Sequence, residues 1–167
     1  MKIIWKNVED GQDKIIESWM SADDRRNLCM QQKGWKQTAS DIWDCLRFSK
    51  NGQIRNCLGF VSSIQQPVVA VMFGIEESGK TLNIYNIITN PKYRGKGIAK
   101  QALSDILRGD KFSLNKTHSK TKVCSFPNNI AIKNVLKNLN FSDPIFDGEY
   151  MVFEKQLEKD KENAQSK

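Results

Sequence analysis

The chain has 167 residues, with 26 Lys or Arg against 19 Asp or Glu, which gives a formal net charge of +7. This length suits one domain with a substantial core, and the ordinary composition excludes wholesale disorder. No apolar run approaches the length of a transmembrane helix, and the N-terminus lacks a signal-peptide core, so we expect no membrane association.

The positive charge indicates an anionic partner, for which nucleic acid and a polyphosphate cofactor are both candidates. Because the lysines are spread along the chain, a solvated surface is favoured over a dedicated nucleic-acid face. The four cysteines, Cys29, Cys45, Cys57 and Cys124, show no C-x-x-C spacing, and we expect neither a metal site nor a disulfide framework. Reduced thiols in a cytoplasmic protein are the simplest interpretation.

The N-terminal third predicts one strand followed by helices. Residues 2–8 suit a strand, and residues 13–20 suit a short amphipathic helix. Ser21 and Asp24 have the spacing of a capping box, which predicts a second helix to about Gln32. A third helical stretch is predicted over residues 38–48.

The middle of the chain predicts strands over residues 54–64, 68–75 and 81–89, with a turn at residues 76–80. Residues 74–81 also match the phosphate-loop pattern G-x-x-x-x-G-K-T. A true phosphate loop opens a helix, whereas β-prone residues follow here, so a hairpin turn is the better interpretation.

A basic, glycine-punctuated loop follows the third of these strands. It contains Arg94-Gly95-Lys96-Gly97 and precedes a helix with an apolar stripe from Ile98 to Leu107. A strand, loop and helix in this order offer backbone amides to an anion, and the helix dipole adds a partial positive charge. Glycine permits positive φ and close approach of a ligand. With Arg94, Lys96 and Lys100 nearby, we predict a pyrophosphate cradle.

The C-terminal part predicts a polar loop over residues 108–120, a strand over 121–126, and a last main helix. Residues Ile132, Val135, Leu136 and Leu139 give that helix one core-facing stripe. Asn128 or Asn129 is expected to cap it, and Asn140 to take the left-handed position after it. Residues 141–146 and 149–157 predict a closing hairpin.

Two segments resemble the signatures of the GCN5-related N-acetyltransferases (GNAT). Residues 94–99 match R/Q-x-x-G-x-G/A, with Ala99 as the small last residue. Residues 129–141 resemble the family's Asn-initiated helix ending in Leu-Gly-Phe, with Asn140 in place of glycine. With the strand order, the resemblance covers roughly residues 54–157, and the N-terminal helices match in general form.

The resemblance implies an α/β acyl-CoA N-acyltransferase (GNAT) fold, with a mixed, mostly antiparallel central sheet flanked by helices. We expect a single domain over residues 1–156 and a charged, disordered tail over 157–167, in a monomer or homodimer. The implied reaction is acetyl transfer from acetyl-CoA to a primary amine of a small molecule, peptide or protein. The implied cofactor-binding residues are Ile87, Ile88, Thr89, Arg94, Gly95, Lys96, Gly97, Ile98, Ala99, Lys100 and Asn129.

The general base is not given by the resemblance. Many relatives place a glutamate on the central strands, but residues 82–89 contain no carboxylate, and Glu76 and Glu77 fall on a predicted turn. A relayed water ordered by Asn83, Tyr85 or Asn86 is an alternative.

The general acid is also open. Relatives often carry a tyrosine where this chain has Leu136, so Tyr150 is the nearest candidate. Cys124 has no neighbour in sequence that would lower its pKa and is interpreted as a buried strand residue. His118, the single histidine, lies in the polar loop, and a catalytic triad built on it is disfavoured.

Two other functions stay open. The missing tyrosine and glutamate fit a catalytically weak module that binds CoA as a ligand. The basic charge permits an acetyltransferase that acts on an RNA-linked substrate, such as aminoacyl-tRNA, or on a ribosomal protein.

Overall fold

The computed structural model describes residues 2–9, 11–21, 24, 54–61, 66–76, 78–112 and 118–157. The predicted helices over 21–32 and 38–48 therefore lie outside the described residues, apart from Ser21 and Asp24. The same holds for Glu77, for residues 113–117 and for the predicted tail from residue 158 onward.

In the described part of the chain, seven strands form one mixed sheet in the order β1-β2-β3-β4-β5-β7-β6. The strands are β1 (Ile3–Asn7), β2 (Ile54–Val61), β3 (Pro67–Ile75), β4 (Thr81–Thr89), β5 (Lys120–Ser125), β6 (Ile145–Phe146) and β7 (Met151–Gln156). Strands β4 and β5 run parallel, and the other neighbouring pairs are antiparallel. The predicted mixed, mostly antiparallel sheet is confirmed.

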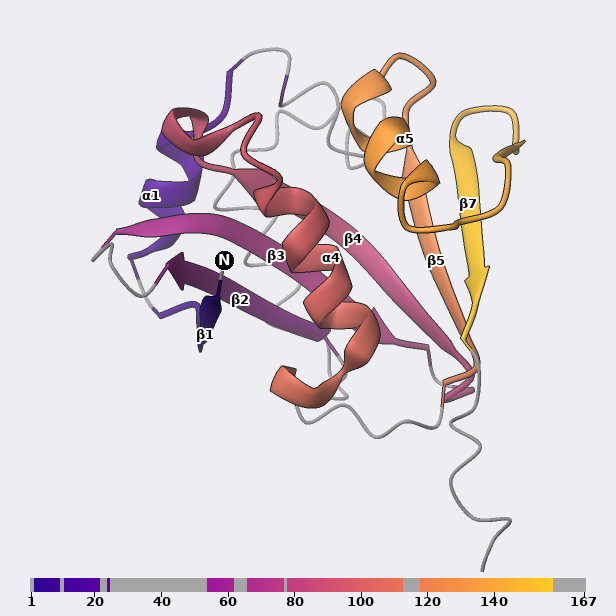
Figure 1. Cartoon of the computed structure of the whole chain (residues 1–167), viewed down its shortest axis with the longest axis horizontal. Helices are drawn as coiled ribbons and strands as arrows, with labels where there is room; N and C mark the ends of the chain where they lie inside the picture. The colour runs from indigo at the N-terminus through magenta and orange to yellow at the C-terminus, as the bar shows by residue number, and fades with distance from the viewer. Residues whose placement is uncertain are drawn as a thin grey trace, which may run out of the picture.

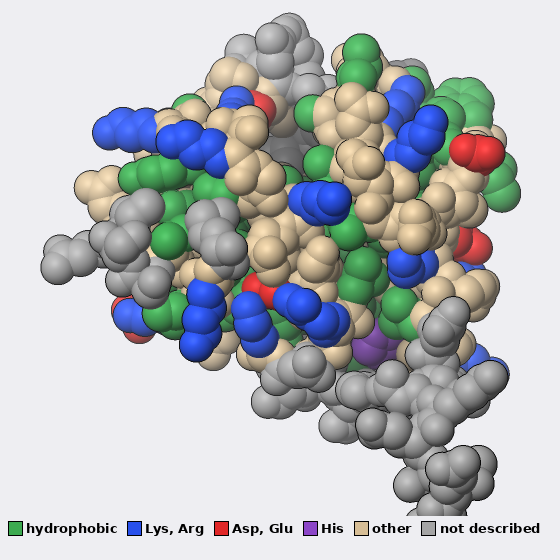
Figure 2. All heavy atoms as spheres, in the orientation of Figure 1, with side chains coloured by type: hydrophobic (Ala, Val, Ile, Leu, Met, Phe, Trp, Pro, Cys, Tyr) green, Lys and Arg blue, Asp and Glu red, His purple; other side chains and the backbone are tan. Residues whose placement is uncertain are grey.

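Helices cover both faces of this sheet (Figure 1). The helical elements are α1 (Asp13–Ser18), η1 (Pro91–Tyr93), α4 (Ile98–Arg108), η2 (Asp110–Phe112) and α5 (Ile130–Lys137). Helices α4 and α5 pack on one face, with Leu103 and Leu136 fully buried, and α1 packs on the other through Ile16. Lys and Arg side chains are scattered over the face that carries α4 (Figure 2), which agrees with their spread along the sequence.

Strand β3 lies at the centre of the molecule and is buried along nearly its whole length. It has strand neighbours on both sides and helices on both faces, which explains why its sequence, PVVAVMFGI, is almost uniformly apolar. Each fully buried side chain of this size, such as Phe73, contributes about 1.5–3 kcal/mol through removal from water.

The hairpin between β3 and β4 occupies the segment that matches the phosphate-loop pattern. The amide of Glu76 donates to the carbonyl of Thr81 at 2.9 Å, and the amide of Gly79 donates to Glu76 at 2.7 Å. Strand β4 begins at Thr81, where a phosphate loop would begin a helix. The predicted hairpin turn is confirmed.

Strand β4 contains a β-bulge at Tyr85. Met72 of β3 pairs with Asn86 and Phe73 pairs with Ile84, so Tyr85 is one extra residue without a partner on β3. The extra residue shifts the alternation of side chains by one. Ile84 and Ile87 therefore both pack with the α4 core, while Asn86 and Ile88 face the α1 core.

Strands β4 and β5 separate after a short stretch of pairing. Their parallel ladder runs from Thr81–Lys120 to Ile84–Val123, and β4 continues to Thr89 paired with β3 but not with β5 (Figure 1). Among the described residues, one edge of β4 beyond Ile84 consequently has no strand neighbour, so backbone groups along this edge can contact a ligand.

A buried carboxylate fastens α4 to β1 and η2. The side chain of Asp105 accepts hydrogen bonds from Trp5 Nε1 at 3.0 Å, Gln101 Nε2 at 2.9 Å, Arg108 at 2.6 Å and Lys111 Nζ at 2.6 Å. Burial by itself would raise the pKa of Asp105, but these hydrogen bonds outweigh it and hold the pKa below its ordinary value.

Two sequence expectations need correction. The strand predicted over residues 141–146 is only Ile145–Phe146, because Pro144 lacks an amide and the amide of Phe141 turns back to the Leu136 carbonyl at 3.1 Å. The predicted polar loop after α4 includes the 3-10 turn η2, whose Phe112 is buried with its ring centroid 4.9 Å from that of Phe73.

Candidate active site

A cavity of about 530 Å³ opens where β4 and β5 separate. Its walls come from β4, the glycine loop, α4, β5 and α5, together with Asp24. The lining residues are Asp24, Ile84, Tyr85, Asn86, Ile87, Ile88, Thr89, Tyr93, Arg94, Gly95, Gly97, Ile98, Ala99, Lys100, Val123, Cys124, Ser125, Asn129, Ala131, Ile132 and Val135. The fold thus brings together every predicted cofactor-binding residue except Lys96.

The turn after β4 sets the direction of the glycine loop. Asn90 is buried, its side chain accepts a hydrogen bond from the amide of Lys92 at 3.1 Å, and its Nδ2 donates to the Pro67 carbonyl at 3.3 Å. Pro91 follows at the first position of η1, where its missing amide costs no hydrogen bond. The chain therefore leaves the sheet in a fixed direction.

Two glycines give the loop its shape. Gly95 and Gly97 both have a φ of 75°, in the left-handed region that side chains disfavour, and Gly97 is the N-cap of α4. A Cβ added at either position would meet no atom within 4 Å. The requirement for glycine is therefore one of backbone conformation, and the space beside each residue is open.

A row of backbone amides at the start of α4 has no acceptor within the described residues. The amide of Arg94 donates to the Pro91 carbonyl, and the amide of Gln101 donates to the Gly97 carbonyl. The amides between them, those of residues 95–100, make no hydrogen bond to another described residue. Such a row at a helix N-terminus is suited to a phosphate group.

The positive side chains of the loop take different positions. Lys100 lines the cavity, whereas Lys96 lies outside its lining, with Nζ 5.3 Å from the centroid of the Tyr93 ring. Of the two lysines predicted to surround the cradle, Lys100 therefore lies at the cavity and Lys96 does not.

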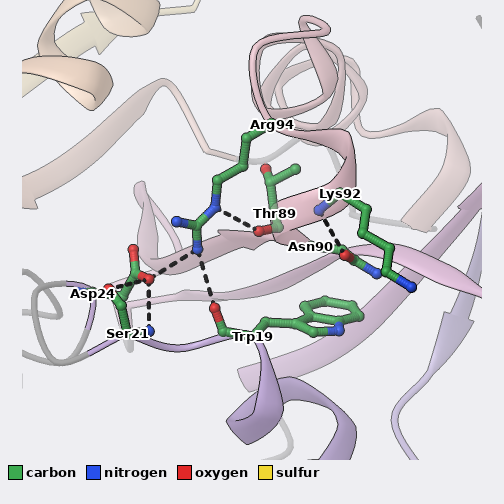
Figure 3. A network of polar contacts seen from close by, with 7 residues as sticks. All are labelled: Trp19, Ser21, Asp24, Thr89, Asn90, Lys92 and Arg94. Atoms are coloured by element: carbon green, nitrogen blue, oxygen red, sulfur yellow. Dashed lines mark hydrogen bonds and ion pairs between the residues drawn. The ribbon is translucent and has the colours of Figure 1, made fainter.

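The side chain of Arg94 extends from the loop toward α1 (Figure 3). Its Nε donates to the Thr89 carbonyl at 3.1 Å, and one terminal nitrogen donates to the Trp19 carbonyl at 3.2 Å. The same nitrogen forms an ion pair with Asp24 at 2.9 Å. The guanidinium thus contacts the end of β4 and the residues that follow α1.

The predicted capping box at Ser21 and Asp24 is present. The Asp24 amide donates to Ser21 Oγ at 3.1 Å, and the Asp24 carboxylate accepts from the Ser21 amide at 2.8 Å and hydroxyl at 2.7 Å. Burial would raise the pKa of Asp24, but the hydrogen bonds from Ser21 and the Arg94 guanidinium together hold it below its ordinary value. Asp24 is therefore ionised at neutral pH.

The opposite wall is built by β5 and the start of α5. Asn129 caps α5 as predicted, with its side chain accepting from the Ile132 amide at 3.3 Å, and Asn140 has the predicted left-handed φ of 57°. Cys124 is half-buried and lines the cavity, and burial raises the pKa of its thiol. Sequence reasoning missed Cys124 and Ser125 as wall residues, because only the parallel pairing with β4 brings them there.

The candidate catalytic residues are divided by the fold. Tyr85 and Asn86 line the cavity, Tyr85 at the bulge with 37% of its surface exposed and Asn86 buried with 5%. Tyr150 is not among the lining residues, and its hydroxyl donates to Glu149 at 2.9 Å. Leu136 is fully buried in the core, and His118 is buried as well, in contrast to the exposed position that a polar loop suggests.

Across the described ranges, no helix is both long and apolar enough to cross a membrane. In that same part of the chain, no three His, Cys, Asp or Glu side chains gather in a metal-binding arrangement.

The profile of the acetyltransferase (GNAT) family matches residues 9–141. Among solved structures, the chain is similar to an acetyltransferase from Thermus thermophilus, at 15% identity and a TM-score of 0.72, with 94% of this chain and 98% of that one covered. It is also similar to spermidine N-acetyltransferase from Vibrio cholerae in complex with CoA and spermine, at 12% identity and a TM-score of 0.69, with 93% and 95% covered.

A third similar structure is the ribosomal-protein-S18-alanine N-acetyltransferase from Escherichia coli, at 11% identity and a TM-score of 0.63, with 97% and 98% covered. A comparison with curated proteins finds no match. At these identities the structural likeness establishes the fold, and the family profile, which spans most of the chain, establishes membership. As the two sequence signatures predict, the chain belongs to the acetyltransferase (GNAT) family.

Proposed function

We propose that the protein transfers an acetyl group from acetyl-CoA to a primary amine. One observation carries the proposal: one cavity is lined both by the start of α4 and by the edge of β4, whose amides and edge have no partner among the described residues. The first feature suits a diphosphate and the second an amide-containing chain that ends in a thioester. Acetyl-CoA combines both groups in one molecule.

The diphosphate of acetyl-CoA is assigned to the loop and the first turn of α4. The amides of residues 95–100 would donate to its oxygens, and the dipole of α4 adds a partial positive charge at the same place. Lys100 contributes a full charge from within the lining. Asn129, on the facing wall, is assigned to the same ligand nearer its acetyl end.

The unpaired edge of β4 is assigned to the pantetheine arm and the thioester. Backbone groups of Ile87, Ile88 and Thr89 would form hydrogen bonds with the amides of that arm, as they would with a neighbouring strand. A backbone amide held in this rigid strand is suited to donate to the oxyanion that develops on the thioester carbonyl. Much of the acceleration would come from holding amine and thioester in contact.

The amine must lose a proton before it attacks the thioester carbon. Its nitrogen then forms the new amide bond as the carbon–sulfur bond breaks and CoA leaves as the thiolate. The wall formed by β4 carries no carboxylate, so we assign proton removal to a water ordered by Tyr85 and Asn86, which both line the cavity. Tyr150 remains the predicted proton donor to the thiolate, although it is not among the residues that line the cavity.

The acceptor class is proposed from the chemistry that the acceptors of two similar structures share. Spermidine and the alanine of ribosomal protein S18, named for two similar structures, both offer amines. A primary amine is therefore the acceptor that we propose, on either a small molecule or a protein.

A second candidate function is a module that binds CoA without turnover. It is favoured by the buried Leu136, which occupies the position where the family resemblance places a tyrosine, and by the lack of a carboxylate on β4.

A turnover assay distinguishes these two functions. The purified chain is mixed with acetyl-CoA and a panel of primary amines, including polyamines, amino acids and peptides with a free N-terminus, and released thiol is measured with a chromogenic reagent. We expect acceptor-dependent release of CoA together with an acetylated product of the expected mass. Binding of CoA by calorimetry without release for any amine would favour the binding module, and failure to bind CoA would refute both.

A further inference from the structure

Arg94 belongs to the family signature, yet its side chain is engaged by the protein itself. From this engagement we infer that Arg94 is a positioning residue, which holds the glycine loop against Trp19 and Asp24 in one fixed arrangement around CoA. The inference rests on the proposed function, because it concerns how the same cavity binds CoA. In this arrangement the loop amides bind the phosphate groups, and the Arg94 guanidinium does not contact them.

The first argument comes from the acceptors of the guanidinium. Two of them are backbone carbonyls, those of Thr89 at the end of β4 and Trp19 just after α1, at 3.1 and 3.2 Å. A backbone carbonyl moves only when its strand or helix end moves. Arg94 therefore links the end of β4 to the residue just after α1, and its partner Trp19 lies 75 residues away in the chain (Figure 3).

The second argument comes from the charge of Asp24. Its carboxylate lines the cavity and would repel a diphosphate at close range if it stood alone. The ion pair with Arg94 at 2.9 Å compensates that charge, and the hydrogen bonds from Ser21 hold the carboxylate in place. Loss of Arg94 would release the contact between the two elements and expose an uncompensated anion to the ligand.

The planar fork of arginine is suited to this task, since it reaches several oxygens in fixed directions. Lysine keeps the charge but offers a single flexible ammonium, which is a good phosphate ligand and a poor substitute for a fork. A direct phosphate contact and a positioning role therefore predict opposite behaviour of Arg94→Lys. They also differ for Asp24→Asn, which would free Arg94 for phosphate in the first case and loosen the wall in the second.

The test measures the affinity of the full chain for CoA by calorimetry, at a temperature where circular dichroism shows each variant folded. We expect Arg94→Lys and Asp24→Asn each to weaken CoA binding by about fivefold or more. In steady-state assays both should raise KM for acetyl-CoA more than they lower kcat. In a double variant the second substitution should add little, because both residues serve one contact.

Asp105→Asn serves as the control for stability. Asp105 lies outside the cavity lining, so this variant should lower Tm and leave the affinity for CoA within twofold of the unmodified chain. Full CoA affinity in Arg94→Lys, or tighter binding in Asp24→Asn, would overturn the positioning role while the proposed function stands. If the unmodified chain binds no CoA, the proposed function and this inference both fail.

Discussion

Gly97 and Gly79 share one backbone constraint at different places in the molecule. Their φ angles are 75° and 67°, and a Cβ at either position would meet no atom within 4 Å. We expect Gly97→Ala and Gly79→Ala each to cost about 1 kcal/mol of unfolding free energy, because alanine resists positive φ. Only Gly97→Ala should weaken CoA binding, by roughly tenfold.

Urea unfolding and calorimetry with CoA measure the two effects separately. Gly79 belongs to the β3–β4 hairpin and lies outside the cavity lining, which makes its variant a control for strain alone. Equal CoA affinities in the two variants would contradict the assignment of the diphosphate to the loop.

Cys124 gives a prediction that depends on pH. Burial raises the pKa of its thiol, and the nearby Asp147 adds to the rise while Lys122 opposes it. A raised pKa keeps the thiol protonated at pH 7, so we expect iodoacetamide to label it more slowly than a free cysteine, with the rate rising in alkaline solution. Acetyl-CoA should slow the reaction further, because Cys124 lines the cavity.

Mass spectrometry of the labelled peptide provides the rate at each pH. Fast labelling at pH 7 would mean that the thiol is activated, and labelling indifferent to acetyl-CoA would mean that the ligand lies elsewhere. The buried Cys57 provides a reference for a thiol that is inaccessible in the folded chain.

At the scale of the elements, Asp105 determines how firmly α4 is held against β1 and η2. We expect Asp105→Asn to lower the unfolding free energy by about 3 kcal/mol, because Lys111 and Arg108 would lose the carboxylate that they share. Trp5 also donates to this carboxylate, and urea unfolding followed by circular dichroism measures the loss of stability.

The same carboxylate should make stability depend on pH. Because the pKa of Asp105 is lower in the folded chain than its ordinary value, its contribution is complete above the unfolded pKa of about 3.9. The contribution is lost as pH falls through the folded pKa. The difference between the unmodified chain and Asp105→Asn should therefore shrink in acid, and a difference independent of pH would contradict this role.

The elements that sequence predicts well are those with local signals. Residues close in sequence are enough to predict four features. These are strand β4, the positive φ of the loop glycines, the Asn129 cap and the left-handed conformation of Asn140. The capping box between Ser21 and Asp24 is of the same kind.

The features that sequence misses depend on pairing between distant residues. The bulge at Tyr85 exists only relative to β3, and the place of Cys124 in the cavity depends on where the β4–β5 ladder ends. The partners of Arg94 lie up to 75 residues away, and nothing near Arg94 in sequence identifies them. Long-range geometry of this kind leaves no periodic trace in a single sequence.

At the scale of the whole molecule, the sheet consists of an antiparallel part, β1 to β4, and a smaller part, β5 to β7. The short parallel ladder joins them at one end, and the cavity lies between their open ends. A ligand that contacts both walls should therefore stabilise the fold. At a CoA concentration of 100 times Kd we expect about 2.7 kcal/mol of added stability.

For a chain of this length that stabilisation corresponds to a rise in Tm of about 5–10 °C, measurable by differential scanning fluorimetry. Hydrogen exchange should slow in β4 and at the start of α5 together. Slower exchange confined to one wall would mean that the ligand does not bridge the two parts.

The bulge in β4 also has a consequence for how this protein tolerates insertions and deletions. Between Ile84 and Ile87 the number of residues determines which face each later side chain occupies. Losing or gaining a single position there would turn Ile88 toward α4 and Ile87 toward α1, inverting the remainder of the strand. Changes of length should instead be accepted in the β3–β4 hairpin, where extra residues leave the order of faces untouched.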